Sequence, residues 1–224
     1  MLKPGDTVFV EDPGYYNLFG LLKLQGVRLV GVPRPANGPN IDAAEELLRQ
    51  HQPKLFFVNT VFQNPTATNI APQVAFKLLQ LVTQQGFTIV EDDIYADFQT
   101  VPTQRLASLD QFDRVIYVGG LSKTLSSLRI GYLAANRELV KNLVDVKVLT
   151  SLGGTRFAAS LLERGTYRKY LERLRKRVRD SLSSAVQTLE GYGWDVFDEL
   201  SGGNLVWAKR CRASRIPLCS SRKP

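Results

Sequence analysis

The sequence predicts an α/β protein whose mainly parallel sheet carries helices on both faces. Through the first 135 residues, short apolar runs rich in β-branched and aromatic residues alternate with amphipathic stretches. Gly26 and Gly86 follow two of those stretches, as glycine commonly does where a helix ends. Parallel strands need crossover connections, usually helices, so regular alternation of the two patterns indicates a parallel sheet between helical layers.

The expected strands are short apolar runs bounded by turn residues. They are Thr7–Glu11, Arg28–Val32, Lys54–Asn59, Phe87–Glu91, Arg114–Val118 and Arg129–Ala134. The helices expected between them are Tyr16–Gln25, a helix capped by Asp42 that runs to Arg49, and Pro72–Gln85. Glu45 and Glu46 suit the first turn of the second helix, because negative charge is favourable near a helix N-terminus.

The pattern changes around residue 136, where long helical patterns replace the alternation. Helices are expected over residues 138–149 and 157–189, and strands over residues 196–197 and 204–208. We therefore expect a large domain over residues 1–135 and a linking helix with a partial α+β small domain over 136–208. Residues 209–224 lack any periodic pattern and are expected to form a disordered tail.

Composition indicates an ordinary soluble globular protein, with 44% of its 224 residues hydrophobic and 22% charged. No run approaches the roughly 20 apolar residues of a membrane span, and the first residues lack a signal-peptide core, so we expect a cytoplasmic protein without membrane contact.

The cysteines and the histidine argue against two kinds of site. A disulfide framework is not expected from Cys211 and Cys219, and a zinc site is not expected with His51 as the single histidine. The basic residues of 168–179 are expected on the solvent face of an amphipathic helix, with phosphate binding as the alternative.

Polar segments follow four of the expected strands at the point where each strand ends. They are EDPGY (11–15), QNPT (63–66), EDDIY (91–95) and GGLSKT (119–124). Ligands of a doubly wound sheet bind beyond the carboxyl ends of its strands. The order of these segments therefore places Tyr15, Asn64, Asp92 and Lys123 around one crevice.

This set of side chains suits an aldehyde cofactor with a heteroaromatic ring. The amine of Lys123 can form an imine with an aldehyde. A buried, ionised Asp92 needs a cationic partner, which a protonated pyridine nitrogen would supply. Asparagine and tyrosine can donate to a phenolate oxygen, and an aromatic ring can stack on the cofactor. Arg129 with the hydroxyl residues Ser122, Ser126 and Ser127 suits a phosphate monoester.

The segments QNPT, EDDIY and GLSKTLSSLRIGYLAA resemble the signatures of class I/II aminotransferases, which are pyridoxal-phosphate-dependent proteins of fold type I. The EDD form, and SKTL followed closely by LRIGYLA, are most similar to the aminotransferase-like domains of GntR/MocR-type transcriptional regulators. The similarity runs from about residue 2 to about residue 208. It implies a small-molecule amino acid or 2-oxo acid as ligand and a homodimer with the active site at its interface.

The resemblance also implies a role for individual residues. Lys123 would form the imine with pyridoxal phosphate and, in an active enzyme, move a proton from the substrate α-carbon. Asp92 would pair with the pyridine nitrogen. Three roles fall to several side chains together: Asn64 and Tyr95 would hydrogen-bond the phenolic oxygen, Tyr15 would stack on the ring, and Ser122 and Arg129 would bind the phosphate.

Three departures from the family pattern keep alternatives open. The chain lacks the phosphate-binding turn and the DNA-binding domain that precede this segment in such proteins, so DNA contact is expected only through a missing N-terminal domain. Five residues separate Lys123 from Arg129, one fewer than usual, and the segment after Trp207 lacks the later arginine that binds the substrate carboxylate. The hypotheses are therefore an aminotransferase, the effector-sensing domain of a GntR/MocR-type regulator, and an inactive truncated product with weak or no activity.

Overall fold

The computed structural model describes residues 2–101, 103–146, 152–197 and 202–210. Its centre is a six-stranded sheet with the order β2-β1-β3-β4-β5-β6. The strands are β1 (Thr7–Asp12), β2 (Arg28–Pro33), β3 (Pro53–Asn59), β4 (Thr88–Asp92), β5 (Val115–Gly120) and β6 (Gly131–Ala134). The first five strands are parallel, and β6 runs antiparallel to β5. The α/β class with a mainly parallel sheet is confirmed.

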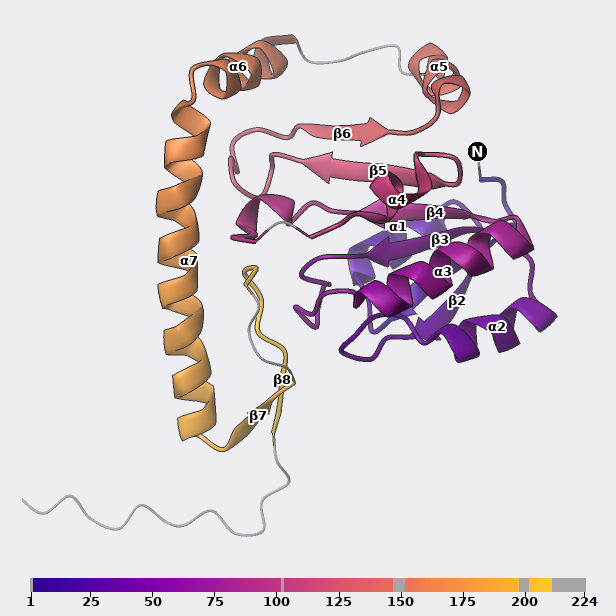
Figure 1. Ribbon diagram of the computed structural model, residues 1–224, viewed down its shortest axis with the longest axis horizontal. Coiled ribbons are helices and arrows are strands. Elements are labelled where there is room, and N and C mark those ends of the chain that lie inside the picture. Colours follow the sequence, from indigo (N-terminus) through magenta and orange to yellow (C-terminus); the bar gives the residue numbers. More distant parts are fainter. Residues whose placement is uncertain (1, 102, 147–151, 198–201, 211–224) are drawn as a thin grey trace, which may run out of the picture.

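Three helices cover one face of this sheet, and they bury the main core (Figure 1). They are α2 (Ile41–Gln50), α3 (Pro72–Gln85) and α4 (Leu106–Asp110). Alternate residues of each strand point to this face, so Phe9 and Phe56 pack there with Leu78 of α3 and Leu106 of α4. All four side chains are buried, and such burial of large apolar groups is the main force that holds the layer together.

The opposite face of the sheet is covered less completely. Helix α1 (Tyr16–Leu24) packs there through Leu22 against Val8 and Val10 of β1. Farther along the same sheet lies an apolar hollow of about 560 Å³, between β3–β6 and helix α5 (Arg137–Val146). Its apolar lining includes Leu55, Phe57, Val90, Ile116, Val118, Leu133, Leu139 and Leu143. The strands thus expose hydrophobic side chains on this face that the described chain does not cover.

Local sequence explains where the helices start and stop. Asn40, not Asp42, is the N-cap of α2: its side-chain oxygen accepts a hydrogen bond from the backbone N–H of Ala43 at 3.0 Å. The prediction of an Asp42 cap was wrong, because the helix starts at Ile41, two residues earlier than a cap at Asp42 requires, and Asp42 lies in its first turn. Helix α3 opens with Pro72 and ends at Gly86, whose positive φ of 78° glycine adopts without strain.

Replacing Asn40 with alanine should lower the free energy of unfolding by about 1 kcal/mol, because one N–H of α2 loses its acceptor. Asp42→Ala removes only a favourable charge near the helix end, so its cost should be smaller, about 0.5 kcal/mol. Urea titration of both variants measures the difference. An equal or larger loss in Asp42→Ala would restore Asp42 as the cap.

The second part of the chain begins after β6, so the boundary proposed at residues 135 and 136 falls in the loop between β6 and α5. Helix α5 follows, and its predicted continuation to residue 149 lies outside the described residues. The single helix predicted over residues 157–189 is two helices, α6 (Leu152–Glu163) and α7 (Thr166–Gly191). The break falls at Gly165, which has a positive φ of 67° that interrupts helical geometry.

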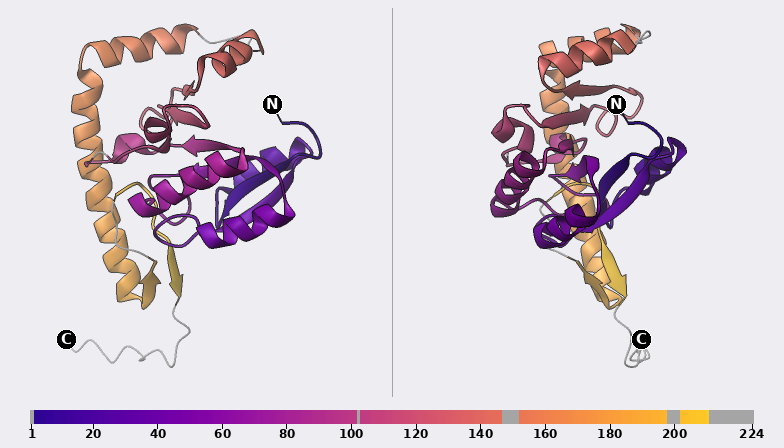
Figure 2. Two further views of the ribbon diagram at one scale, coloured as in Figure 1. Left: turned by 45° about the vertical axis from the view of Figure 1, so that its right-hand side comes forward. Right: turned by 90° about the vertical axis from the view of Figure 1, so that its right-hand side faces the viewer.

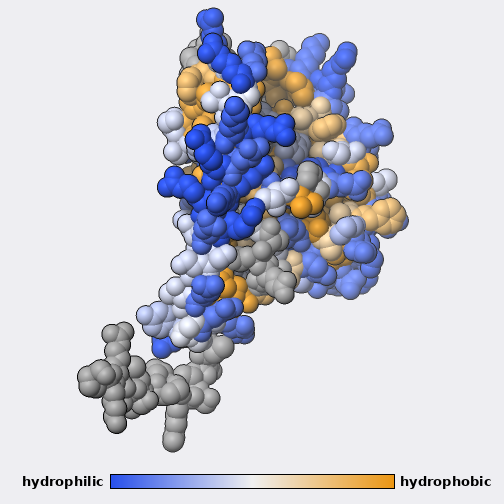
Figure 3. Space-filling model, turned by 60° about the vertical axis from the view of Figure 1, so that its left-hand side comes forward, coloured by the Kyte–Doolittle hydropathy of each residue, from blue (hydrophilic) through white to orange (hydrophobic). Residues whose placement is uncertain are grey.

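Helix α7 stands apart from the helices of the sheet and runs along one side of the molecule (Figures 1 and 2). It leads into a short antiparallel pair, β7 (Trp194–Val196) and β8 (Ala208–Arg210). The strand predicted over 204–208 was wrong in extent, because only its last residue belongs to β8. The charged residues of α7 gather on its exposed face, as the amphipathic pattern predicts (Figure 3). The predicted tail, apart from the two residues in β8, lies outside the described part.

No helix in the described part of the chain is long and apolar enough to cross a membrane.

Candidate active site

The carboxyl ends of four parallel strands bring the predicted polar segments to one edge of the sheet. Asp92 is the last residue of β4 and pairs in register with Asn59, the last residue of β3. The Asn59 side chain donates to the backbone oxygen of Asp92 at 2.9 Å, which fastens the two strand ends together. The lysine segment follows β5, and Tyr15 follows β1.

Lys123, Tyr95 and Asn64 lie together at this edge. The amine of Lys123 is 5.1 Å from the centre of the Tyr95 ring, within the range of a cation–π contact. The amide of Asn64 donates to the Tyr95 hydroxyl at 3.3 Å. Tyr95 itself is buried against Val61, Phe62 and Phe98, so its ring has a fixed position. An exposed amine beside two fixed hydrogen-bonding groups can attack and hold a carbonyl compound.

Asp92 lines a small cavity together with Tyr15 and Asn59. Burial raises the pKa of the Asp92 carboxyl, while the N–H of Ile94, at 3.2 Å from Oδ1, and the positive charge of Lys123 act to lower it. Within the described residues Asp92 forms no ion pair. A partly buried carboxylate that forms no ion pair can accept a cationic ligand.

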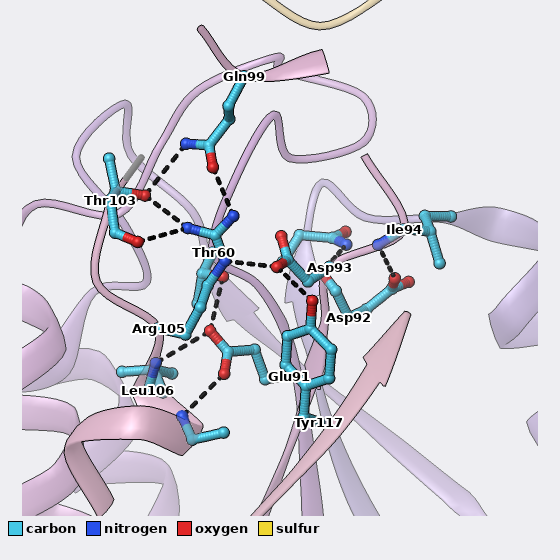
Figure 4. Close-up of polar contacts among 12 residues, drawn as sticks. Thr60, Glu91, Asp92, Asp93, Ile94, Gln99, Thr103, Arg105, Leu106 and Tyr117 are labelled. Atoms are coloured by element: carbon cyan, nitrogen blue, oxygen red, sulfur yellow. Dashed lines mark hydrogen bonds and ion pairs between the residues drawn. The ribbon is translucent and has the colours of Figure 1, made fainter. Parts of the chain in front are cut away.

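The neighbouring Asp93 is already paired and points away from Asp92 (Figure 4). Its carboxylate accepts hydrogen bonds from Arg105 and, at 2.8 Å, from the Tyr117 hydroxyl. Burial raises the pKa of Asp93, and the Arg105 guanidinium opposes that rise. The two adjacent carboxylates therefore have different surroundings, and only Asp92 faces the cavity shared with Tyr15.

The carboxylate of Glu91 is a structural anchor that sequence reasoning left without a role. It is fully buried and accepts hydrogen bonds from the Thr60 hydroxyl at 2.8 Å and from the N–H groups of Leu106 and Ala107 at 3.0 and 2.8 Å (Figure 4). These contacts tie β4 to the loop after β3 and to the start of α4. A glutamate inside an otherwise apolar strand was the available signal.

A second buried network holds the loops that carry Tyr15 and Asn64. Glu11 and Arg34 form a buried ion pair, and Glu11 also accepts the N–H of Asn59 at 3.0 Å. Gln63 donates to the backbone oxygen of Pro13 at 2.8 Å and accepts from the N–H of Thr66 at 3.0 Å. The loop after β1 and the loop after β3 are thus fixed to each other. The sequence offered no local sign of this pairing, because its partners lie far apart in the chain.

The expected phosphate-binding residues are less closely assembled. The hydroxyl of Ser122 lies 3.5 Å from the backbone oxygen of Ile130, at the limit of a hydrogen bond. Arg129 is exposed and has no hydrogen bond or ion pair with another residue of the described ranges. Its guanidinium is therefore free to bind an anion.

The chain is similar to known proteins in both sequence and overall fold. The family model described as aminotransferase class I and II matches residues 1–215. The 2-aminoadipate transaminase of Thermus thermophilus is 34% identical over 223 residues, which cover 92% of this chain and 55% of that protein. An uncharacterized HTH-type transcriptional regulator of Bacillus subtilis, YisV, is 30% identical over 216 residues, which cover 92% of this chain and 45% of that protein.

A solved structure shows the same architecture. LysN, an alpha-aminoadipate aminotransferase of Thermus thermophilus in complex with N-(5′-phosphopyridoxyl)-L-leucine, superposes with a TM-score of 0.85 at 30% sequence identity. The match covers 94% of this chain and 57% of that one. The chain spans about half the length of the curated relatives it matches.

Proposed function

Because the chain belongs to the class I and II aminotransferase family, we propose that it binds pyridoxal 5′-phosphate through the amine of Lys123. The observation that carries this proposal is the position of that amine, 5.1 Å from the centre of the Tyr95 ring, in the segment that follows β5, next to the strand that ends at the partly buried Asp92. A nucleophilic amine, a carboxylate that forms no ion pair within the described residues, and fixed phenol and amide groups match the aldehyde, the ring nitrogen and the phenolic oxygen of this cofactor.

In this assignment each side chain has one task. Asp92 binds the protonated ring nitrogen, because an ionised carboxylate in a partly buried place is stabilised by a cation. Asn64 and Tyr95 hydrogen-bond the phenolic oxygen, and their mutual contact at 3.3 Å sets their spacing. Tyr15, which lines the cavity with Asp92, stacks on the ring. Ser122 and the free guanidinium of Arg129 bind the phosphate.

We propose transamination between an amino acid and a 2-oxo acid as the reaction of the whole protein. Bound pyridoxal phosphate supplies an electron sink for the bond that breaks at the substrate α-carbon. Lys123 would take the proton from that carbon and deliver it to the carbon that carried the aldehyde, a task for which its amine must be free and close by. Asp92 keeps the ring nitrogen protonated throughout. The cytoplasm is the proposed location.

The direct test is titration of the chain with pyridoxal phosphate, followed by borohydride reduction and peptide mapping. A saturable visible absorbance band and a stable mass adduct on Lys123 are expected. Pyridoxal without its phosphate should bind at least tenfold more weakly if Ser122 and Arg129 hold that group, since a charge-assisted hydrogen bond contributes about 1.5–3 kcal/mol. An adduct spread over several lysines would refute the assignment.

A second candidate function is effector sensing in a GntR/MocR-type regulator, favoured by the 30% identity to the HTH-type regulator YisV. A sensor and an enzyme share the cofactor site but differ in turnover. The loaded protein should be mixed with a panel of amino acids and an excess of a 2-oxo acid that accepts the amino group, while the newly formed 2-oxo acid is measured. Many equivalents of product per protein indicate an aminotransferase, whereas at most one equivalent with a change in absorbance indicates a sensor.

Homodimer formation is a further part of the proposal, and the apolar hollow on the sheet supports it. Uncovered surface of this kind commonly marks an association site. The chain should therefore sediment above its monomer mass at micromolar concentration. Leu133→Lys, which puts a charge into the hollow, should shift the distribution toward monomer, while Leu109→Lys on the exposed side of α4 should not. A sharp monomer peak for the unaltered chain would contradict this.

A further inference from the structure

Helix α7 packs directly on the segment that carries Lys123. Leu121 and Leu125 of that segment pack in one cluster with Tyr167 and Leu171 of α7 and with Ala158 of α6. Helix α7 lies more than 40 residues farther along the chain and belongs to its second part. The side chains around Lys123 are therefore supported from outside the sheet.

The hydroxyl of Tyr167 forms hydrogen bonds with both Thr124 and Asp97. Tyr167 is only 7% exposed, and its hydroxyl donates to the carboxylate of Asp97. Burial and the hydrogen bond to Asp97 raise the pKa of Tyr167, so the phenol keeps its proton and donates it. The Thr124 hydroxyl lies 2.6 Å from the Tyr167 oxygen and, since the phenol proton is directed to Asp97, acts as the donor there.

These contacts fall on the immediate neighbours of two site residues. Thr124 follows Lys123 directly, and Asp97 lies two residues after Tyr95, whose ring faces the lysine amine. Two further hydrogen bonds from α7 reinforce the link: Tyr170 donates to the backbone oxygen of Thr124 at 2.5 Å, and Arg175 to that of Asp97 at 2.6 Å. One helix thus holds both the lysine segment and the turn that carries Tyr95.

We infer that Tyr167 is a positioning residue, which fixes the side chain of Thr124 and thereby holds the neighbouring Lys123, with its amine over Tyr95. This inference rests on the proposed function, in which Lys123 is the cofactor-binding lysine. It also gives α7 a role beyond packing, because any shift of that helix moves Thr124 and Asp97 together. Loss of the Tyr167 hydroxyl should therefore loosen the lysine segment while leaving the sheet unchanged.

Tyr167→Phe keeps the ring and removes the hydroxyl, and Tyr192→Phe is the matched control, because Tyr192 borders the same helix and is 80% exposed. Amide hydrogen exchange is measured first, without cofactor. Leu125 and Leu128 donate backbone hydrogen bonds inside the lysine segment, at 2.7 and 2.8 Å. Their exchange should become about tenfold faster in Tyr167→Phe, because the buried hydrogen bonds of the Tyr167 hydroxyl to Thr124 and Asp97 are lost, and stay unchanged in the control.

Variants of Thr124 test the same link from its other end. Thr124→Val removes the hydroxyl and should reproduce the faster exchange, whereas Thr124→Ser keeps it and should not. Tyr167→Phe combined with Thr124→Val should be no worse than Tyr167→Phe alone, because Tyr167→Phe already removes the hydrogen bond to the Thr124 hydroxyl.

Release of reversibly bound pyridoxal phosphate is measured next, well below the unfolding temperature of each variant. About tenfold faster release from Tyr167→Phe is expected, as for the exchange, with no change for Tyr192→Phe. If the unaltered chain forms no Lys123 adduct, the proposed function fails, and the inference fails with it. If the adduct forms but either exchange or release is unchanged in Tyr167→Phe, the inference alone is overturned.

Discussion

Lys123→Ala should abolish the borohydride-stable attachment of pyridoxal phosphate and the visible absorbance band that accompanies it. The reason is geometric, because no other lysine of the described ranges is placed at the carboxyl edge of the sheet. Lys54, for example, lies at the start of β3, the opposite end of that strand, and forms an ion pair with Asp6 at 2.8 Å. Its amine is distant from the side chains that match the cofactor.

The matched control is Lys54→Ala, which removes a lysine of the same sheet without touching the candidate site. It should keep the full amount of adduct, with at most a small loss of stability from the exposed ion pair. Mass mapping after reduction distinguishes specific attachment from random reaction of surface amines. Retention of a one-to-one adduct in Lys123→Ala would show that another lysine holds the cofactor and would remove the basis of the functional proposal.

Much of the sheet was predictable because its signals are local. The apolar runs and the glycines at 26 and 86 specify where strands and helices lie, and the six strands appear within one or two residues of the expected positions. The convergence of the four polar segments at one edge followed from the rule for parallel strands. The errors concern the start of α2, where the cap is Asn40 and not Asp42, the break at Gly165 within one predicted helix, and the extent of the strand predicted over 204–208.

The supporting contacts of the candidate site were not predictable from local patterns. Glu11 meets Arg34 across 23 residues, and Tyr167 meets Thr124 across 43. The local sequence indicates nothing unusual at these positions: Glu11 is a carboxylate at a strand end, Arg34 is a cation in a loop, and Tyr167 is an apolar position of a helix. Only the folded arrangement shows that they fix the loops of Tyr15, Asn64 and Lys123 in place.

Asp92→Asn should weaken cofactor binding and, at the same time, stabilise the cofactor-free fold at neutral pH. Burial raises the pKa of this carboxyl above its unfolded value of 3.8. A carboxyl with a raised pKa binds its proton more tightly in the folded state, so its contribution to stability is best at low pH and falls as the pH rises through the folded pKa. At neutral pH the ionised group therefore opposes folding, and the neutral amide removes that cost. Asparagine keeps an oxygen for the N–H of Ile94, so the local hydrogen bond survives.

When pyridoxal phosphate is bound, the negative charge of Asp92 strengthens binding, because it pairs with the protonated ring nitrogen. Its removal should weaken binding about a hundredfold, in line with the roughly 3 kcal/mol lost when one partner of a buried ion pair is removed. Asp93→Asn is the control: its carboxylate is held by Arg105 and Tyr117, so cofactor affinity should change less than about threefold, or under ~0.7 kcal/mol. Thermal unfolding and cofactor titration measure the two effects separately. A larger loss of affinity in Asp93→Asn would assign the ring nitrogen to Asp93, and a lower melting temperature of cofactor-free Asp92→Asn would refute the sign derived from the raised pKa.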